Sequence, residues 1–183
     1  MLSFRDNEQA FRDFITQHQP RVYNTALNLL QNAEDAEEIT QDVFIEAWNK
    51  AHTFKGEAQV STWLYRITIN KSIDHLRSKK RKKRFAFLTS LFHDSGEPIS
   101  DAGDFVHPGV VTENREKAAI LYKAIDKLPE TQKIAFLLSE TAGLSYAEIS
   151  EITGNSVSSI ESILFRARKN LRGMLADFYK KEG

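Results

Sequence analysis

The sequence SYAEISEITGNSVSSIESILFRARKNLR occupies residues 145–172 and contains two helical patterns separated by a short turn. Ser145 and Glu148 have the spacing of a capping box, in which each side chain caps the backbone N–H of the other residue at a helix start. Gly154 ends this short helix, and a turn of about three residues precedes a long helix that begins at Val157. A short helix, a tight turn with glycine and a longer helix are typical of a helix-turn-helix.

The long helix has an apolar face and an opposite face that suits DNA. The apolar residues, expected to pack on the short helix, are Val157, Ile160, Leu164, Ala167 and Leu171. The opposite face carries small hydroxyls that can reach base edges in a major groove and cations that can pair with phosphates. It consists of Ser158, Ser159, Glu161, Ser162, Phe165, Arg166 and Lys169, with Arg168 and Arg172 beside them. An ordinary helical hairpin with a solvated basic end is the alternative.

Helical periodicity continues along the rest of the chain, and no segment has the two-residue alternation of a strand. We therefore expect an all-α protein of two small helical domains joined by a long linker, with the helix-turn-helix ending the second domain. Pro20 is expected to end a first helix before another begins at Val22, and Ser61 is expected to cap a later one. The other helices are expected from 32 or 35 to 50, from 61 to 84, and at 113–127, 130–141, 145–153 and 157–178. The predicted domains are residues 1–84 and 113–183, and the linker is residues 85–112.

Composition restricts the classes of protein to which the chain can belong. It has 183 residues, of which 41% are hydrophobic and 27% charged, and it has no cysteine. The lack of cysteine excludes disulfides, thiolate catalysis and cysteine zinc sites, and it suits a reducing cytoplasm. No apolar run approaches the roughly 20 residues of a membrane helix, and no secretory signal pattern opens the chain. We expect a cytoplasmic protein that is not inserted in a membrane.

Nothing in the sequence has the spacing of a catalytic or metal site. The five histidines are scattered without ligand spacing, and the chain has neither a Gly-Lys phosphate loop nor a His-Glu-x-x-His motif. We therefore expect no enzyme, no metal, no cofactor and no small-molecule substrate.

A formal net charge of zero hides a strong asymmetry along the chain. Residues 71–84 contain eight basic residues and one acidic residue, whereas residues 85–112 contain four acidic residues and no lysine or arginine. The basic block is typical of an arm that binds a polyanion or of a solvated tail. Trp63 and Tyr65 begin the same helix, and aromatic rings beside cations suit single-stranded nucleic acid. A place in the core is the alternative for both rings.

The helix expected near residues 34–50 is acidic on the outside, which would repel DNA. Its acids are Glu34, Asp35, Glu37, Glu38, Asp42 and Glu46. Together with Gln41, Phe44, Ile45 and Trp48 they form a mixed acidic and apolar face, which suits a basic protein partner. A merely solvated acidic face is the alternative, and an exposed Phe44 or Trp48 would weaken it.

Three separated segments together resemble bacterial sigma factors. Residues 35–48 (DAEEITQDVFIEAW) resemble the segment that binds core RNA polymerase, and residues 61–77 resemble the segment that melts the promoter and binds its -10 element. Residues 128–172 resemble the domain that binds the -35 element. Because it has only these two domains, in family order and spacing, the chain resembles the small extracytoplasmic-function (ECF) class.

The resemblance implies a promoter-specificity subunit whose partners are core RNA polymerase, promoter DNA as duplex and as single strand, and an anti-sigma factor. Binding to the β′ clamp helices of the polymerase would involve Asp35, Glu38, Gln41, Asp42, Phe44 and Trp48. Binding of the -10 element, with a flipped base, would involve Phe54, Lys55, Gly56, Gln59, Trp63, Arg66, Asn70, Asp74 and Arg77. Binding of the -35 element would involve Ser159, Glu161, Ser162, Phe165, Arg166 and Lys169. The linker would contact other polymerase surfaces and would mimic RNA charge through Asp94, Glu97, Asp101 and Asp104.

The sequence also departs from the family pattern. Glu161 and Ile163 stand where the recognition helix is often basic, so the -35 sequence cannot be transferred from relatives. Leu64 stands where housekeeping sigma factors have a melting aromatic, which implies weaker melting. The alternative function is a stand-alone helix-turn-helix regulator with an N-terminal oligomerisation or signalling domain. Such a regulator would bind duplex DNA tightly without polymerase.

Overall fold

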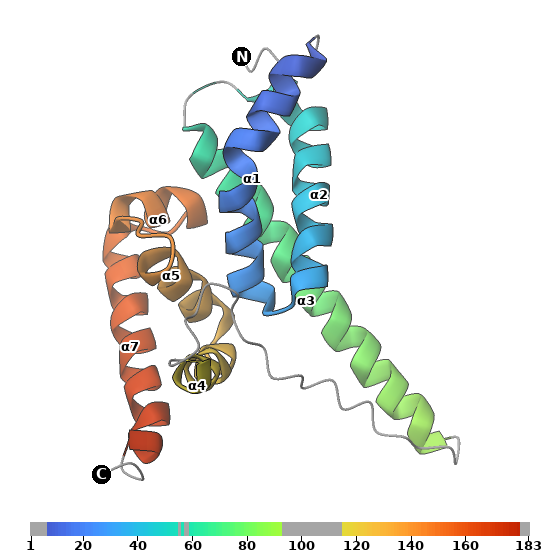
Figure 1. The fold of residues 1–183 in the computed structure, drawn as a ribbon. Helices are drawn as coiled ribbons and strands as arrows, with labels where there is room; N and C mark the ends of the chain where they lie inside the picture. Colours follow the sequence, from blue (N-terminus) through green and yellow to red (C-terminus); the bar gives the residue numbers. More distant parts are fainter. Residues whose placement is uncertain (1–6, 55, 57–58, 93–114, 180–183) are drawn as a thin grey trace.

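The structure is a computed structural model that describes residues 7–54, 56, 59–92 and 115–179. These residues form seven α-helices and one 3₁₀ turn, with no strand among them, so the expectation of an all-α fold is confirmed (Figure 1). The helices are α1 (Glu8–Leu30), α2 (Ala33–Lys50), α3 (Val60–Phe92), α4 (Arg115–Asp126), α5 (Glu130–Glu140), α6 (Tyr146–Thr153) and α7 (Val157–Tyr179), and the 3₁₀ turn η1 is Ala51–Thr53. None of the described helices is long and apolar enough to cross a membrane.

Helices α1, α2 and α3 pack along one another and form a first unit (Figure 1). Asn32 starts α2 because its side-chain oxygen accepts a hydrogen bond from the Asp35 N–H at 2.8 Å. The core of the unit consists of Phe14, Val22, Ala26, Leu27, Leu30, Ala36, Ile39, Val43, Phe44, Ala47, Ala51, Leu64 and Ile67. Leu64, the residue expected to weaken melting, is a core residue here.

Two expectations about helix ends in this unit are wrong. Helix α1 runs without a break from Glu8 to Leu30 and contains Pro20, whose ring lies at an exposed position. An interior proline removes a helical hydrogen bond and costs about 3 kcal/mol, but Phe14 and Val22 anchor both halves of α1 in the same core. Helix α3 begins at Val60, so Ser61 lies within the helix and does not cap it.

Helices α4 to α7 form a second unit, in which the predicted helix-turn-helix is present. The Ser145 hydroxyl accepts a hydrogen bond from the Glu148 N–H at 3.3 Å, and the Glu148 carboxylate accepts one from the Ser145 N–H at 2.8 Å. The Ser145 hydroxyl also donates to the Glu148 carboxylate at 2.7 Å, and this bond, together with that from the Ser145 N–H, holds the pKa of the Glu148 carboxyl below its ordinary value. Gly154 ends α6 with φ +74°, a left-handed conformation that favours glycine, and the chain enters α7 three residues later.

The apolar face of α7 is shorter than expected. Ile160, Leu164, Ala167 and Leu171 are buried, as the periodicity predicts. Val157 is 48% exposed, so its expected place in the core is wrong. It is the first residue of α7, one turn before the helix reaches the core. Ile163 is buried as well and lies beside the predicted apolar positions.

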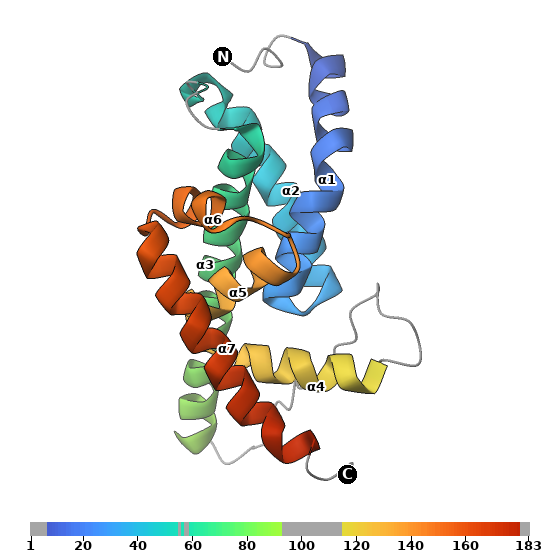
Figure 2. The same cartoon turned by 90° about the vertical axis from the view of Figure 1, so that its left-hand side faces the viewer.

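The larger hydrophobic core of the molecule crosses from one unit to the other. It contains Leu29 of α1 and Tyr65 and Ile69 of α3 together with buried residues of α4 to α7. Both views place α6 beside α3 and α5 beside α1 (Figures 1 and 2). The two units therefore form one packed body in the described part of the chain.

Helix α3 continues beyond the core of the first unit. In Figure 1 its light green end extends away from the other helices, and the basic residues Lys80–Arg84 on it are exposed. Residues 85–92, the start of the predicted linker, are helical and belong to α3. The rest of the predicted linker, including the four acids proposed to mimic RNA, lies outside the described residues.

Candidate polymerase and nucleic-acid interfaces

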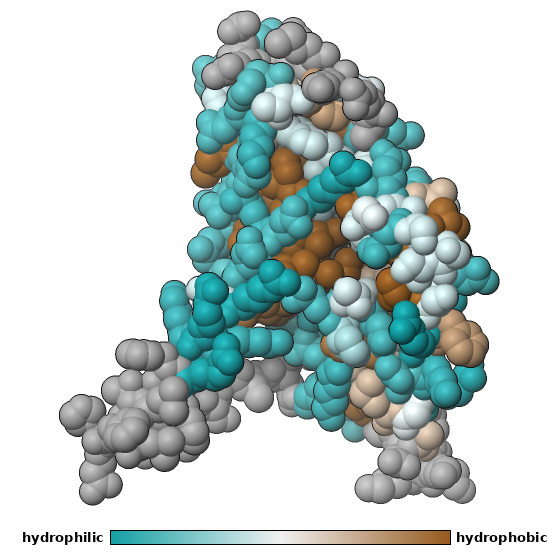
Figure 3. Space-filling model, turned by 180° about the vertical axis from the view of Figure 1, so that it is seen from behind, coloured by the Kyte–Doolittle hydropathy of each residue, from teal (hydrophilic) through white to brown (hydrophobic). Residues whose placement is uncertain are grey.

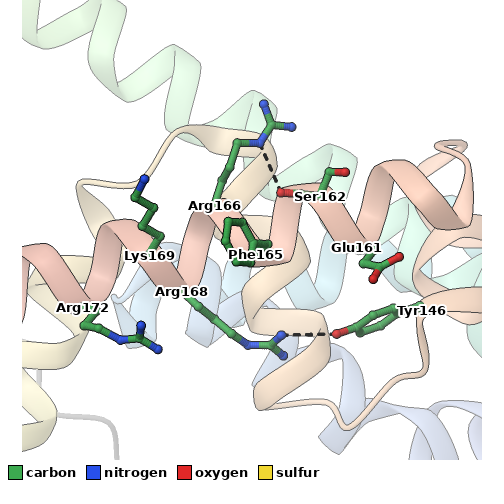
Figure 4. Close-up of a pocket in the computed structure, with 8 residues that line it drawn as sticks. All are labelled: Tyr146, Glu161, Ser162, Phe165, Arg166, Arg168, Lys169 and Arg172. Atoms are coloured by element: carbon green, nitrogen blue, oxygen red, sulfur yellow. Dashed lines mark hydrogen bonds between the residues drawn. The ribbon is translucent and has the colours of Figure 1, made fainter.

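The outer face of α7 borders an open concavity of about 1020 Å³ (Figure 4). Its lining residues are Tyr146, Glu161, Ser162, Phe165, Arg166, Arg168, Lys169 and Arg172. Five of the six residues predicted to read the -35 element are among them. The sixth, Ser159, is half-buried in the first turn of α7. The Ser156 hydroxyl accepts a hydrogen bond from the Ser159 N–H at 3.2 Å and so caps the helix that carries this face.

The cations of this face are held in different ways. Arg168 donates a hydrogen bond to the Tyr146 hydroxyl at 3.2 Å (Figure 4). It also donates to the Glu140 carboxylate at 2.7 Å, and the two bonds raise the pKa of its guanidinium. Arg166 donates only to the backbone oxygen of Ser162, at 3.2 Å, among the bonds found in the described chain. Phe165 lies between these side chains and is 69% exposed. An exposed aromatic ring flanked by arginines fits a nucleic-acid or protein partner better than water.

Tyr146 is a member of this face that sequence analysis missed. It is the first residue of α6, where the capping box explains the pattern without any role for the phenol. Only the folded structure brings its hydroxyl to Arg168, which lies 22 residues later in the chain.

The residues predicted for the -10 element fall into two groups. Phe54 follows η1, and its ring centroid lies 5.3 Å from that of Trp63 at the start of α3. Gly56 has φ +78°, Gln59 is exposed, and Lys55 lies outside the described residues. Trp63 is half-buried. One part of its ring packs against the core of the first unit, and the rest is accessible beside Phe54.

The second group, Arg66, Asn70, Asp74 and Arg77, lies further along α3, where all four residues are exposed. The guanidinium of Arg66 donates hydrogen bonds to the backbone oxygen of Glu151 in α6, one of them from Nε at 3.2 Å. Arg77 pairs with Glu130 at the start of α5 at 2.8 Å and lies 3.9 Å from Asp74. Asn70 borders a pocket of about 170 Å³ between α3 and the second unit. Seen from behind, hydrophobic residues gather in the hollow between the two units (Figure 3).

An apolar groove of about 360 Å³ runs between α1 and α2. It is lined by Phe11, Ile15, Gln19, Thr40, Gln41, Phe44, Ile45 and Trp48. Three of the six residues predicted to bind polymerase, Gln41, Phe44 and Trp48, line it. Phe44 is buried and Trp48 half-buried, whereas Ile45 is 61% exposed, so the accessible apolar side chain here is Ile45.

The acidic residues of α2 are divided between solvent and α3. The Asp35 carboxylate accepts a hydrogen bond from Lys79 at 2.9 Å and lies 3.2 Å from Nε2 of His75, so it holds the basic part of α3. Lys71 lies 3.1 Å from Glu46 and 3.5 Å from Asp42. Glu38 is exposed and takes part in no ion pair found among the described residues. Of the predicted polymerase-binding acids, Glu38 is therefore the most accessible.

These pairs also change the acidity of the groups involved. Burial alone would raise the pKa of the Glu46 carboxyl, but hydrogen bonds from Lys50 and Lys71 bring it below its ordinary value. Burial alone would lower the pKa of Lys71, but Glu46 and Asp42 raise it. Both shifts favour the charged forms, so the link between α2 and α3 is an ion pair at neutral pH.

Comparison with known families gives two matches in chain order. Residues 14–82 match the model described as Sigma-70 region 2, and residues 118–171 match the model described as Sigma-70, region 4. Together the two matches cover about two thirds of the chain.

Individual relatives agree with these matches. The chain is 28% identical to the RNA polymerase sigma-H factor of Pseudomonas aeruginosa and 27% identical to the ECF RNA polymerase sigma-E factor of Escherichia coli. Each alignment covers 90% of this chain and 86% of the relative. Among solved structures, the fold is similar to that of the sigma factor RpoE in its complex with the anti-sigma factor NepR from Bartonella quintana. That match has a TM-score of 0.68 at 23% identity and covers 91% of this chain and 96% of the other.

Proposed function

Because the chain belongs to the sigma-70 family and is a sigma factor, we propose that its three exposed faces divide the work of initiation among them. The α2 groove binds core RNA polymerase, the polar face of α3 holds the opened -10 strand, and α7 reads the -35 duplex. The observation that carries this proposal is the outer face of α7, where Phe165, Arg166 and Lys169 lie exposed on a capped recognition helix.

The groove on α2 suits a helical partner with basic residues. Ile45 offers apolar surface to a facing helix, and Glu38 at the same surface adds negative charge. Such a combination of an apolar centre and a charged rim is usual for protein interfaces. The coiled β′ clamp helices of core polymerase are the partner that we propose, with Gln41 and Trp48 at the edge of the contact.

The start of α3 suits an unpaired base. Phe54 and Trp63 lie ring beside ring, and the loop after Phe54 turns at Gly56. Extracting a base from a duplex costs a few kcal/mol, which contacts to the flipped base must offset. We assign that role to the loop with Gln59, and we assign contacts to the strand to Arg66, Asn70, Asp74 and Arg77 further along α3, with Lys55 adding charge.

The face of α7 suits duplex DNA. Its hydroxyls and Arg166 stand on the first turns of a helix that a major groove can admit. Ser159, Ser162 and Phe165 reach towards base edges, while Lys169 with Arg168 and Arg172 supplies contacts to phosphates. Glu161 favours a cytosine amine and disfavours phosphate, so it adds specificity at some cost in affinity.

Three further properties belong to the same proposal. The chain is not an enzyme, and it works in the cytoplasm, where core polymerase and promoters are. The sigma factor RpoE binds the anti-sigma factor NepR, and we extend control by an anti-sigma factor to this chain. Its acidic linker contacts additional polymerase surfaces.

The test is reconstituted transcription. Purified chain and core polymerase are incubated with genomic fragments, and run-off transcripts are compared with those of core polymerase alone. The proposal predicts new transcripts with discrete starts that depend on the chain. Absence of such transcripts, together with failure of the chain to co-purify with core polymerase, would contradict it.

One alternative, a stand-alone helix-turn-helix regulator, makes the opposite prediction for isolated protein. It requires tight binding to a duplex operator without polymerase, and it requires that substitutions in the α2 groove leave that binding unchanged. The sigma-factor proposal requires weak duplex binding by the free chain and loss of transcription when the groove is altered.

A further inference from the structure

Val157, the first residue of α7, is exposed on the side of the helix that we assign to DNA. It is 48% exposed, whereas Ile160 and Leu164 on the buried side of α7 are 1% and 0% exposed. Residues four positions apart lie above one another on a helix, so Val157, Glu161 and Phe165 form one exposed strip. Glu161 and Phe165 line the concavity assigned to the -35 duplex. Val157 therefore extends that surface by one turn towards the start of the helix.

Hydrogen bonds around the preceding turn hold the start of α7 in place. The Ser150 hydroxyl of α6 donates to the backbone oxygen of Asn155 at 2.6 Å. The Ser156 hydroxyl accepts from the Ser159 N–H at 3.2 Å and caps the helix. These bonds fix the backbone that carries Val157 before any ligand binds. A contact made by a side chain on such a backbone costs little further ordering.

Positive charge on α7 begins well beyond Val157. The first cation of the helix is Arg166, nine residues later and roughly 13 Å along the helix axis. The charged side chain of the exposed strip is that of Glu161, which DNA phosphates repel. This arrangement favours phosphate contacts by the second half of α7 and base contacts by its first turns.

Thymine is the base that offers an apolar group in the major groove. Its 5-methyl group lies at the groove edge, where the other bases present hydrogen-bond donors and acceptors. Val157 has no polar side-chain atom, so packing it against a donor or an acceptor would leave that group without a partner. Packing it against a methyl group removes apolar surface from water on both sides, which is favourable.

We propose that Val157 is a specificity-determining residue that packs against the 5-methyl group of a thymine in the -35 duplex. This inference rests on the proposed function of α7 and adds one base to the sequence that the helix prefers. Val157 and Glu161 are one helical turn apart, roughly 6 Å along the axis, and successive base pairs are about 3.4 Å apart. The thymine therefore lies within about two base pairs of the cytosine whose amine donates to Glu161.

A promoter library identifies the thymine. A promoter that depends on the chain is randomised in its -35 region, and each fragment carries a barcode in its transcribed part. Run-off transcription at limiting holoenzyme then compares the natural chain with V157A. We expect the natural chain to enrich thymine at one position near the cytosine by roughly three- to fivefold, the factor that one buried methyl group supplies. V157A is expected to lose this enrichment and to keep that of cytosine, which also shows that the variant is folded and active.

A matched control shortens another exposed apolar side chain of the same helix. Met174 is 37% exposed and belongs to none of the proposed DNA or polymerase faces. M174A is expected to enrich the same bases as the natural chain, by the same factors.

Removal of one methyl group from the DNA tests the contact itself. Deoxyuridine pairs with adenine as thymidine does but lacks the 5-methyl group. At the enriched position, we expect deoxyuridine to lower transcription by the natural chain roughly three- to fivefold and to leave transcription by V157A unchanged. This double cycle separates the contact between the two groups from the effect of either change alone. Deoxyuridine in place of a thymidine upstream of the -35 region provides the control.

The outcomes distinguish this inference from the proposed function. Equal thymine enrichment by the natural chain and V157A, equal sensitivity of the two to deoxyuridine, or no enriched thymine within about two base pairs of the cytosine would overturn the inference. Each of these results would leave the sigma-factor function intact. Absence of chain-dependent transcripts with the natural chain would refute the proposed function instead.

Discussion

The two faces proposed for promoter DNA carry similar side chains but differ in what lies against them. On α7, Arg166 and Phe165 border an open concavity. On α3, Arg66 and Arg77 are bonded to the second unit, and Ile69 between them is buried in its core. The α7 face and the α3 face therefore need not become available to DNA at the same time. In this arrangement Arg66 and Arg77 are exposed but would exchange bonds with the second unit for bonds with DNA.

The largest expected effect is the loss of polymerase binding, without which the two DNA faces cannot be compared in the holoenzyme. I45E places a charge on an exposed residue of the α2 groove, so the fold is preserved while the interface must bury an unpaired carboxylate. Such a charge costs about 3 kcal/mol, or roughly 100-fold in affinity. Titration of labelled chain with core polymerase by fluorescence anisotropy measures this loss. M174E makes the same change at an exposed apolar residue of α7 and should bind normally. Normal binding by I45E would remove the groove from the proposed polymerase contact.

Removal of one arginine from each DNA face sharpens the comparison. In the holoenzyme, R166A is expected to weaken -35 duplex binding by about 1–3 kcal/mol, or roughly 5- to 150-fold, because an arginine contact to a base is lost. R66A removes a strand contact and the bond to Glu151 together. Its effect on single-strand affinity should therefore be smaller in the free chain than in the holoenzyme. Competition binding with both DNA forms measures these effects, and equal loss by R66A in both states would contradict the difference between the faces.

Sequence patterns predicted local structure well where the stabilising interactions lie within one turn of helix. The capping box of Ser145 and Glu148 and the left-handed Gly154 act within a few residues, so the helix-turn-helix followed from spacing alone. Pro20 shows the limit of such rules, because the packing of Phe14 and Val22 offsets a local penalty that the sequence displays plainly. Ser61 shows another, since a serine near a helix start need not be its cap.

The candidate sites were predictable as helix faces but not in their surroundings. Phe165, Arg166 and Lys169 follow from the periodicity of one helix, and the structure gathers them on one concavity. The bond between Tyr122 and Asn28 joins residues 94 positions apart, and no periodicity reports such a pair. Packing of the second unit against α1 and α3 depends on contacts of that kind, so it could not be predicted from either half alone.

The short helix α6, which contributes Tyr146 to the open concavity, can be weakened separately from α3. S145A removes the N-cap of α6 and is expected to lower the free energy of unfolding by about 1 kcal/mol. S61A provides the control, because Ser61 lies inside α3 and caps nothing. Differential scanning calorimetry of both variants measures the effect. If S61A lowered the free energy of unfolding as much as S145A, the stabilisation could not be attributed to the capping box.

The smallest expected effect concerns pH and the link between α2 and α3. The pKa of Glu46 is lowered in the folded chain, so its ion pair stabilises the protein well above pH 4.5. That stabilisation is lost as the pH falls below 4.5 and through the folded pKa. The difference in free energy of unfolding between the natural chain and E46Q should be at most about 1 kcal/mol at neutral pH and should shrink towards acid pH. Urea denaturation at several pH values measures it, and a difference that grows towards acid pH would contradict the ion pair.

The distance between the two units, measured with and without core polymerase, tests the contrast between the two faces most directly. Spin labels on Q17C in α1 and G173C in α7 suit pulsed electron resonance, because Gln17 is exposed and a Cβ at Gly173 meets nothing within 4 Å. The account predicts one narrow distance distribution in the free chain and a shift to a clearly different one when core polymerase is added. An identical distribution in both states, with polymerase bound, would contradict it.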